Sequence, residues 1–132
     1  MTDYGRPLSF GVSLDPAADA VHRTRRLARA AEDQGLEYLA VQDHPYQPGH
    51  LDTWTLITHL AAATDRITFL TDVADLQLRP PAMLAKAAAS LAVLTDGRLR
   101  LGVAEVASPT PSRRWAARRD AASPWSPSPR SR

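Results

Sequence analysis

The chain has 132 residues, of which 44% are hydrophobic and 23% charged, and it contains no cysteine. This composition is typical of one globular domain, and it excludes disulfide scaffolds, thiolate zinc sites and cysteine nucleophiles. The length is too short for a complete eight-stranded α/β barrel of about 250 residues. With no apolar run of about 18 residues and no secretory leader pattern in the first ten, we expect no membrane insertion and a cytoplasmic location.

The net charge of +2 is unevenly distributed along the chain. Residues 1–104 carry ten basic and twelve acidic side chains, whereas residues 105–132 carry six and two. A basic folded face would suggest a nucleic-acid partner, but here the positive charge lies in a terminal segment. We therefore do not expect nucleic-acid binding to be the main function.

The first predicted unit is a strand, a helix and a second strand. Residues 8–14 alternate apolar with small or polar side chains, and the following Asp-Pro ends the strand. Residues 17–34 have apolar side chains at helical spacing, and Gly35 is a typical helix stop. Residues 36–41 then form a short apolar strand. Gly11, within the first strand, predicts a close backbone approach. If the sheet is part of a barrel, we expect this approach near the barrel mouth.

The pattern then repeats twice. Asp52 is a suitable N-cap for a helix over residues 53–64, with a strand predicted at residues 67–70. A third helix over residues 82–94 begins after two prolines, and a fourth strand follows at residues 99–103. Strands alternating with helices of this length indicate an α/β fold with a parallel sheet. Composition alone does not separate a doubly wound sheet from the first half of a barrel.

The last segment, residues 105–132, has a different composition. It contains five prolines and six arginines but no leucine or isoleucine, and it shows neither strand nor helix periodicity. Such a segment buries too little apolar surface to offset the entropy of ordering it. We therefore predict two regions: a folded one at 1–104 and a disordered basic, Pro/Arg/Ser-rich tail at 105–132.

Three motifs in the right order carry a resemblance to a known family. They are Gln-Asp-His-Pro-Tyr at 42–46, Leu-Asp-Thr-Trp-Thr at 51–55, and Leu-Arg-Pro-Pro-Ala-Met-Leu at 78–84 leading to Asp-Gly-Arg at 96–98. Together they resemble the luciferase-like monooxygenase family over residues 7 to 103. The order of several motifs is what makes the resemblance specific, because each one alone is weak.

This resemblance implies the first half of a (β/α)8 TIM-type barrel, with about four strands and three helices. It implies oxidoreductase chemistry, the transfer of hydride or oxygen to or from a small organic substrate. The cofactor would be either FMN or an 8-hydroxy-5-deazaflavin coenzyme, and the sequence leaves this choice open. The coenzyme ring would lie at the carboxyl ends of the strands, where this fold keeps its chemistry.

Asp43 and His44 are the candidate catalytic and cofactor-binding pair, because they end the second strand where the family places an acid and a histidine beside the flavin ring. An imidazole that titrates near neutrality can take or give a proton, and a neighbouring carboxylate can orient it. Asp72 and Val73 follow the third strand, where deazaflavin-using relatives have a non-prolyl cis peptide behind the ring. We predict these two as further cofactor-binding residues.

Other polar residues of the chain receive structural interpretations. Arg79 could contact a phosphate or an acidic neighbour, and the second reading is preferred. His22, His50 and His59 have no second ligand at a recognisable spacing, so no metal site is expected. Trp54 and Leu60 are predicted core residues.

The sequence departs from the family pattern near its end. Relatives have a glycine-rich fourth strand end, but here only Gly102 remains and Glu105 stands where a small residue is expected. We expect a truncated barrel whose residues 106–132 are read from a shifted frame. A half barrel would expose two sheet edges, favouring self-association, and the isolated chain is expected to be inactive.

Two alternative functions remain open from the sequence. The chain could be a small α/β interaction module whose basic tail binds an acidic partner or nucleic acid, since paired arginines and two tryptophans in the tail could neutralise phosphates and stack on bases. A doubly wound nucleotide-binding domain is less favoured, because Asp15-Pro16 replaces the glycine-rich loop that should follow its first strand.

Overall fold

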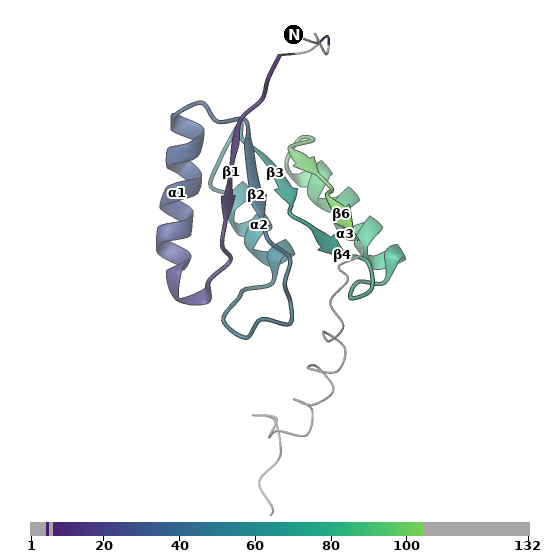
Figure 1. Ribbon diagram of the computed structural model, residues 1–132. Helices are drawn as coiled ribbons and strands as arrows, with labels where there is room; N and C mark the ends of the chain where they lie inside the picture. Colours follow the sequence, from purple (N-terminus) through teal and green to yellow (C-terminus); the bar gives the residue numbers. More distant parts are fainter. Residues whose placement is uncertain (1–4, 6, 105–132) are drawn as a thin grey trace, which may run out of the picture.

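A parallel sheet and helices alternate along the chain in the computed structural model, which describes residue 5 and residues 7–104 (Figure 1). The predicted tail at 105–132 lies outside the described residues. The elements are β1 (Gly11–Leu14), the 3-10 turn η1 (Ala18–Ala20), α1 (Val21–Asp33), β2 (Tyr38–Val41), α2 (Thr53–Ala61), β3 (Thr68–Thr71), β4 (Ala74–Asp75), α3 (Pro81–Leu94), β5 (Leu99–Arg100) and β6 (Val103–Ala104).

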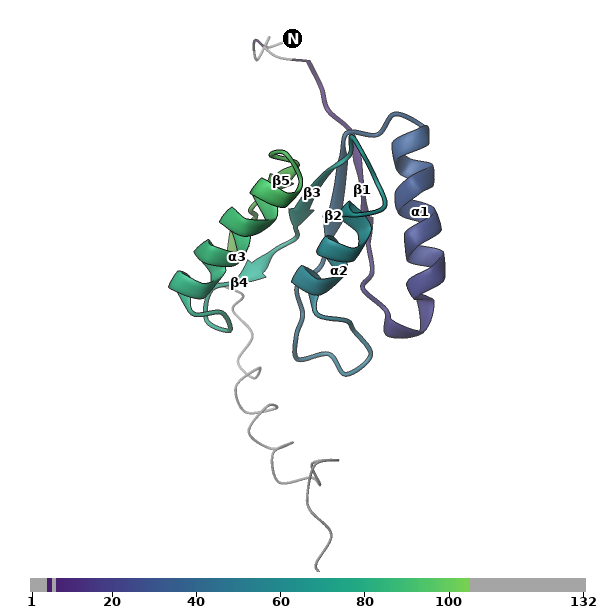
Figure 2. The ribbon, with the colours of Figure 1, turned by 180° about the vertical axis from the view of Figure 1, so that it is seen from behind.

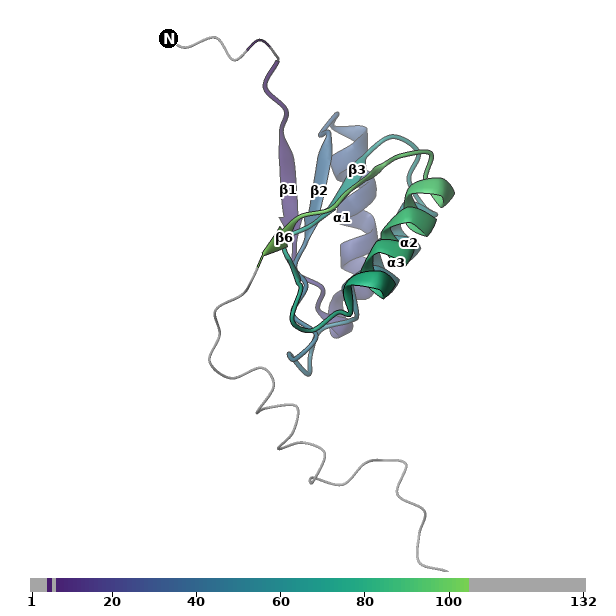
Figure 3. The same ribbon diagram turned by 90° about the vertical axis from the view of Figure 1, so that its right-hand side faces the viewer.

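The order of the strands distinguishes the two folds that composition left open. β1, β2, β3 and β5 lie side by side in chain order and are all parallel, and β4 pairs in parallel with β6. The three α-helices lie side by side over the same face of the sheet (Figures 2 and 3). A doubly wound sheet reverses its strand order and has helices on both faces. The arrangement is instead that of consecutive β/α units of a barrel, which confirms the predicted fold class.

The core lies between the sheet and the helices. Successive residues of a strand point to opposite faces, so every second residue packs under the helices. Leu39, Val41 and Phe69 point to this side and are fully buried, against Ile57 and Leu60 of α2. The prediction that Trp54 and Leu60 belong to the core is confirmed. The opposite, concave face carries side chains of mixed size, from Ser13 and Ala40 to Tyr38 and Leu70.

The predicted fourth strand, residues 99–103, is divided into β5 and β6. The Thr71 hydroxyl donates to the Gly102 carbonyl at 2.7 Å and accepts from the Gly102 amide at 3.1 Å, replacing regular ladder bonds at this point. A Cβ at Gly102 would lie 2.2 Å from the Thr71 carbonyl oxygen, so only glycine fits. Sequence periodicity carries no signal for such a side-chain insertion, nor for a strand as short as the two residues of β4.

The first strand is shorter than predicted, because it lies at the edge of the sheet. Regular pairing begins only at Gly11, and Leu8 and Phe10 before it are 81% and 64% exposed. A Cβ at Gly11 would lie 2.5 Å from the Tyr38 carbonyl oxygen, so the predicted close approach exists. Its predicted place is wrong: Gly11 begins β1 and thus lies at the amino ends of the strands, away from the barrel mouth.

Candidate functional site

The loops that follow the parallel strands gather at one edge of the sheet, the lower edge in Figure 1. We call this the carboxyl edge; it consists of residues 13–17, 42–52 and 72–80. Parallel strands in register necessarily bring their carboxyl ends together. The Asp72 amide donates to the Val41 carbonyl at 2.9 Å, and the Ser13 hydroxyl lies 3.5 Å from Asp72 Oδ2. The candidate residues after β2 and β3 are therefore neighbours in space.

His44 is half-buried in the loop between β2 and α2. Its Nδ1 lies 2.7 Å from the Tyr46 hydroxyl oxygen, and its ring centroid is 6.4 Å from that of His50. The contact with Tyr46 occupies Nδ1, so Nε2 is the ring nitrogen that remains for another partner. Tyr46 was not among the predicted site residues, although its spacing of two from His44 made it a neighbour.

Asp43 does not face His44. It is 1% exposed, and its two oxygens accept from Arg79 Nε and Nη2, each at 2.8 Å. Arg79 Nη2 also donates to Asp52 Oδ1 at 2.9 Å, and the guanidinium lies 5.9 Å from the Trp54 ring centroid. The sequence thus brought Asp43 and His44 together only as chain neighbours, while the partner of the Asp43 carboxylate lies 36 residues further on.

The charges in this cluster stabilise one another. Hydrogen bonds from Arg79 to Asp43 raise the pKa of the guanidinium, against the opposing effect of burial, and Asp52 adds to the rise. Burial acts to raise the pKa of Asp52, but the bond from Arg79 and the amide and hydroxyl of Thr55 outweigh it, so that this pKa is lowered. Of the two partners that the sequence left open for Arg79, the structure shows the acidic neighbour.

The loop that carries His44 is tied to the loop after β1. The Leu51 amide donates to the Pro16 carbonyl and the Ala18 amide to the Gly49 carbonyl, both at 2.8 Å. His50 Nε2 also lies 3.2 Å from Asp15 Oδ1. These contacts hold the tip of the β2–α2 loop, which carries His44, against the neighbouring β/α unit.

Asp72 and Val73 form the bend between β3 and β4, and the peptide bond between them is cis. A non-prolyl cis bond at this position is what the resemblance implies for deazaflavin-using relatives. Asp72 is exposed and Val73 half-buried. The cofactor-binding role of these two residues stays a prediction.

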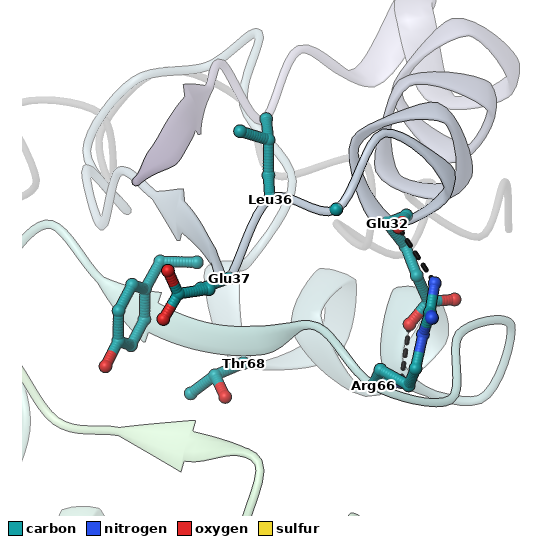
Figure 4. Close-up of a pocket in the computed structure, with 7 residues that line it drawn as sticks. Glu32, Leu36, Glu37, Arg66 and Thr68 are labelled. Atoms are coloured by element: carbon teal, nitrogen blue, oxygen red, sulfur yellow. Dashed lines mark hydrogen bonds between the residues drawn. The ribbon is translucent and has the colours of Figure 1, made fainter. Parts of the chain in front are cut away.

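A hollow of about 310 Å³ lies at the opposite, amino-terminal edge of the sheet (Figure 4). Its wall includes Glu32, which is only 8% exposed and whose carboxylate accepts from the amides of Asp65, Arg66 and Ile67. Burial acts to raise the pKa of Glu32, but these three amides outweigh it and lower the pKa. This fold keeps its chemistry at the carboxyl ends of the strands, so we interpret Glu32 as a structural residue. Its hydrogen bonds join the end of α1 to the loop before β3.

Neither a metal-binding cluster nor a membrane-spanning helix is present among the described residues. Within residue 5 and residues 7–104, no three His, Asp or Glu side chains are grouped in a way that could hold a metal ion. His22 and His59 are exposed, and His50 is half-buried beside Asp15. No helix in this part of the chain is long and apolar enough to cross a membrane.

The parallel sheet, its one-sided helices and the site at the carboxyl edge define a barrel-type α/β protein, and comparisons with known proteins identify the family. The sequence profile of the luciferase-like monooxygenases matches residues 5–126. The chain belongs to the luciferase-like monooxygenase family.

Individual relatives agree with this assignment. The chain is 34% identical over 107 residues to the F420-dependent glucose-6-phosphate dehydrogenase of Kineococcus radiotolerans, covering 76% of this chain and 32% of that protein. It superposes on the coenzyme F420-dependent tetrahydromethanopterin reductase of Methanopyrus kandleri with a TM-score of 0.67 and 28% identity, covering 74% and 27% of the two chains.

A third comparison supports the fold alone. The oxygenating constituent of 3,6-diketocamphane monooxygenase from Pseudomonas putida, solved in complex with FMN, superposes with a TM-score of 0.71 at 24% identity, covering 80% of this chain and 32% of that one. The chain spans about a third of the length of the curated relatives it matches.

Proposed function

We propose that this chain forms part of an oxidoreductase that transfers hydride or oxygen on a small organic substrate, with FMN or the deazaflavin coenzyme F420. The observation that carries the proposal is the carboxyl edge, where the loops that carry His44, Asp72 and Val73 follow neighbouring strands and are held by the hydrogen bonds described above. Named relatives that depend on F420 support that coenzyme, and FMN stays the alternative that the resemblance of the sequence left open.

The residues of the carboxyl edge fit a flat ring. Ser13 and Ala40 are paired in the sheet and point away from the buried Leu39 and Val41, so β1 and β2 present small side chains on the concave face, with Leu70 of β3 next to Ala40. Small side chains leave room for a planar group to approach the backbone. A bound flavin or deazaflavin would supply the capacity to accept or deliver a hydride.

The residues of this chain would manage the proton that accompanies such chemistry. His44 Nε2 is the candidate atom, because the Tyr46 hydroxyl occupies Nδ1. We assign Asp43 a holding function, since both of its oxygens bind Arg79. Asp72 and Val73 would line the ring site. The cytoplasmic location and the inactivity of the 132-residue chain by itself also stay predictions.

Titration of the purified chain with FMN and with F420, in oxidised and reduced forms, tests the proposal through coenzyme fluorescence. We expect saturable binding that His44→Ala weakens, while His59→Ala, an exposed histidine on α2, leaves it unchanged. Equal effects of the two substitutions, or no saturable binding of either coenzyme, would contradict the proposal. Turnover by the 132-residue chain would contradict its predicted inactivity.

We also propose that this chain associates with copies of itself through its exposed sheet edges. Phe10 and Val12 (64% and 37% exposed) lie along the β1 edge, and Leu101 and Val103 (43% and 45% exposed) along the β5 and β6 edge. Apolar side chains beside unpaired strand edges favour association. Sedimentation should show an oligomer that Phe10→Ser or Val103→Ser weakens, with the exposed Ala89→Ser as control; a monomer at all concentrations would exclude it.

A further inference from the structure

We propose that Arg79 is a positioning residue of the carboxyl edge, which holds the buried Asp43 and the start of α2 and thereby fixes where His44 lies. The proposal rests on the proposed function only in that His44 is taken to serve the coenzyme. The positioning itself is a property of this chain and can be measured without any coenzyme.

The geometry requires an arginine. Its Nε and Nη2 donate in parallel to the two oxygens of Asp43, and Nη2 donates a third bond to Asp52. A planar guanidinium matches a carboxylate in this two-pronged manner, whereas a lysine ammonium is a point charge on a flexible stem. Arg79 therefore joins two segments that the chain separates by nine residues, and lysine cannot reproduce all three bonds.

Because the ion pair of Asp43 and Arg79 is largely buried, its loss would displace the loop after β2. The Asp43 side chain is 1% exposed and that of Arg79 is 22% exposed, so neither charge is freely hydrated. Removing one partner of a buried ion pair leaves a charge without water or counter-charge, which is strongly unfavourable. The loop would have to move to hydrate Asp43, and His44 is joined to Asp43 by one peptide bond.

Further contacts join the two ends of this loop. The Thr53 hydroxyl donates to the Gln42 carbonyl, on the residue just before Asp43. Asp52 caps α2 by accepting from the Thr55 amide at 2.9 Å while it binds Arg79. Arg79 thus sits where the exit from β2 and the entry to α2 meet, and a displacement there changes both.

This use of the guanidinium differs from binding an external anion. Two of its three nitrogens are already committed to carboxylates of the same chain. One cation faces two anions, so the cluster carries a net negative charge that repels a phosphate. Arg79 acts inward, on the loop.

Arg79→Lys tests the proposal, with Arg98→Lys as the matched control. Arg98 also donates several hydrogen bonds, to the carbonyls of Thr95, Ile67 and Ala61, but it lies at the amino-terminal edge. The direct measurement is the ring resonance of His44 in ¹H–¹³C NMR spectra of the full chain, assigned by its loss in His44→Ala. We expect Arg79→Lys to shift this resonance and Arg98→Lys to leave it in place.

A folded Arg79→Lys protein with an unchanged His44 resonance would overturn the proposal, as would an equal shift in the control. If Arg79→Lys does not fold, the double variant Asp43→Asn/Arg79→Gln replaces it, because it leaves no buried unpaired charge. We expect the same shift of the His44 ring resonance in this variant.

Coenzyme titration adds a second readout. We expect Arg79→Lys to weaken binding about tenfold, the lower end of what loss of an orienting partner costs at metal sites, and Arg98→Lys to leave it unchanged. If the parent chain binds neither coenzyme, the proposed function fails, while the His44 resonance still decides the role of Arg79.

Discussion

Glu32 offers the clearest test of how the amino-terminal edge is held together. Its carboxylate, 8% exposed at the end of α1, accepts from the consecutive amides of Asp65, Arg66 and Ile67 in the turn before β3. Figure 4 shows the contact of Glu32 with Arg66. Glu32→Gln keeps the size of the side chain but replaces one acceptor oxygen with a donor and removes the charge. All three amides donate to Oε1, which glutamine retains, so the three bonds remain possible but lose the carboxylate charge, and the additional contact of the Asp65 amide with Oε2 is lost.

The magnitude follows from the loss of the negative charge at three hydrogen bonds. A hydrogen bond to a charged group contributes about 1.5–3 kcal/mol and one between neutral groups about 0.5–1.5 kcal/mol, so each bond loses about 1 kcal/mol. We expect Glu32→Gln to destabilise by about 3 kcal/mol, which is a large part of the 5–15 kcal/mol that is typical of whole domains.

Urea unfolding followed by circular dichroism measures this loss. With a slope of about 1–3 kcal/mol/M for a small domain, a loss of 3 kcal/mol lowers the midpoint by about 1–3 M. Asp33→Asn is the control, because Asp33 is an exposed neighbour with no hydrogen bond to the turn among the described residues. We expect the free energy of unfolding of Asp33→Asn to stay within about 0.5 kcal/mol of that of the parent.

The pH dependence gives a second, independent check. The pKa of Glu32 is lowered in the folded state, so its ionised form stabilises the fold above the ordinary glutamate pKa of about 4.3. This contribution is lost as the pH falls through the lowered pKa. The difference in stability between the parent and Glu32→Gln should therefore shrink at acid pH. A difference that stays constant down to pH 3, or a loss below 1 kcal/mol at pH 7, would refute the reasoning.

Three further substitutions test the junction of β3 with β6 and the start of α2. Gly102→Ala should destabilise the fold by about 1–3 kcal/mol or more, because its Cβ would lie 2.2 Å from the Thr71 carbonyl oxygen. In the same urea assay the control Gly49→Ala should be near neutral, because a Cβ at Gly49 would meet no atom within 4 Å. Thr71→Val should cost about 1–3 kcal/mol in thermal unfolding, because it leaves the Gly102 amide without its partner, while the Gly102 carbonyl still accepts from the Ala74 amide at 2.8 Å. Asp52→Ala should cost about 1 kcal/mol through loss of the cap, and urea midpoints should show a gap to the parent that closes at acid pH, because the pKa of Asp52 is lowered.

Much of the fold was predictable from local pattern. Apolar periodicity indicates the helices and strands, and side-chain chemistry indicates where helices begin. Asp52 caps α2 as predicted, and α3 begins at Pro81, one residue before the predicted start. The alternation of elements predicted a parallel sheet, and the three ordered motifs predicted the family. These features depend on residues within a few positions of one another, where the sequence contains the needed information.

The tertiary structure decided the contacts between distant residues. The sequence placed Asp43 beside His44, but folding gave the Asp43 carboxylate to Arg79, 36 residues away. Likewise, nothing in the α1 pattern indicates that Glu32 binds the turn before β3, 33 to 35 residues on. A side chain at the end of a strand or helix can reach several loops, and only the packing of the sheet and helices determines which one it meets. The order of the strands determined the barrel-type fold, and the meeting of their carboxyl ends determined the candidate site.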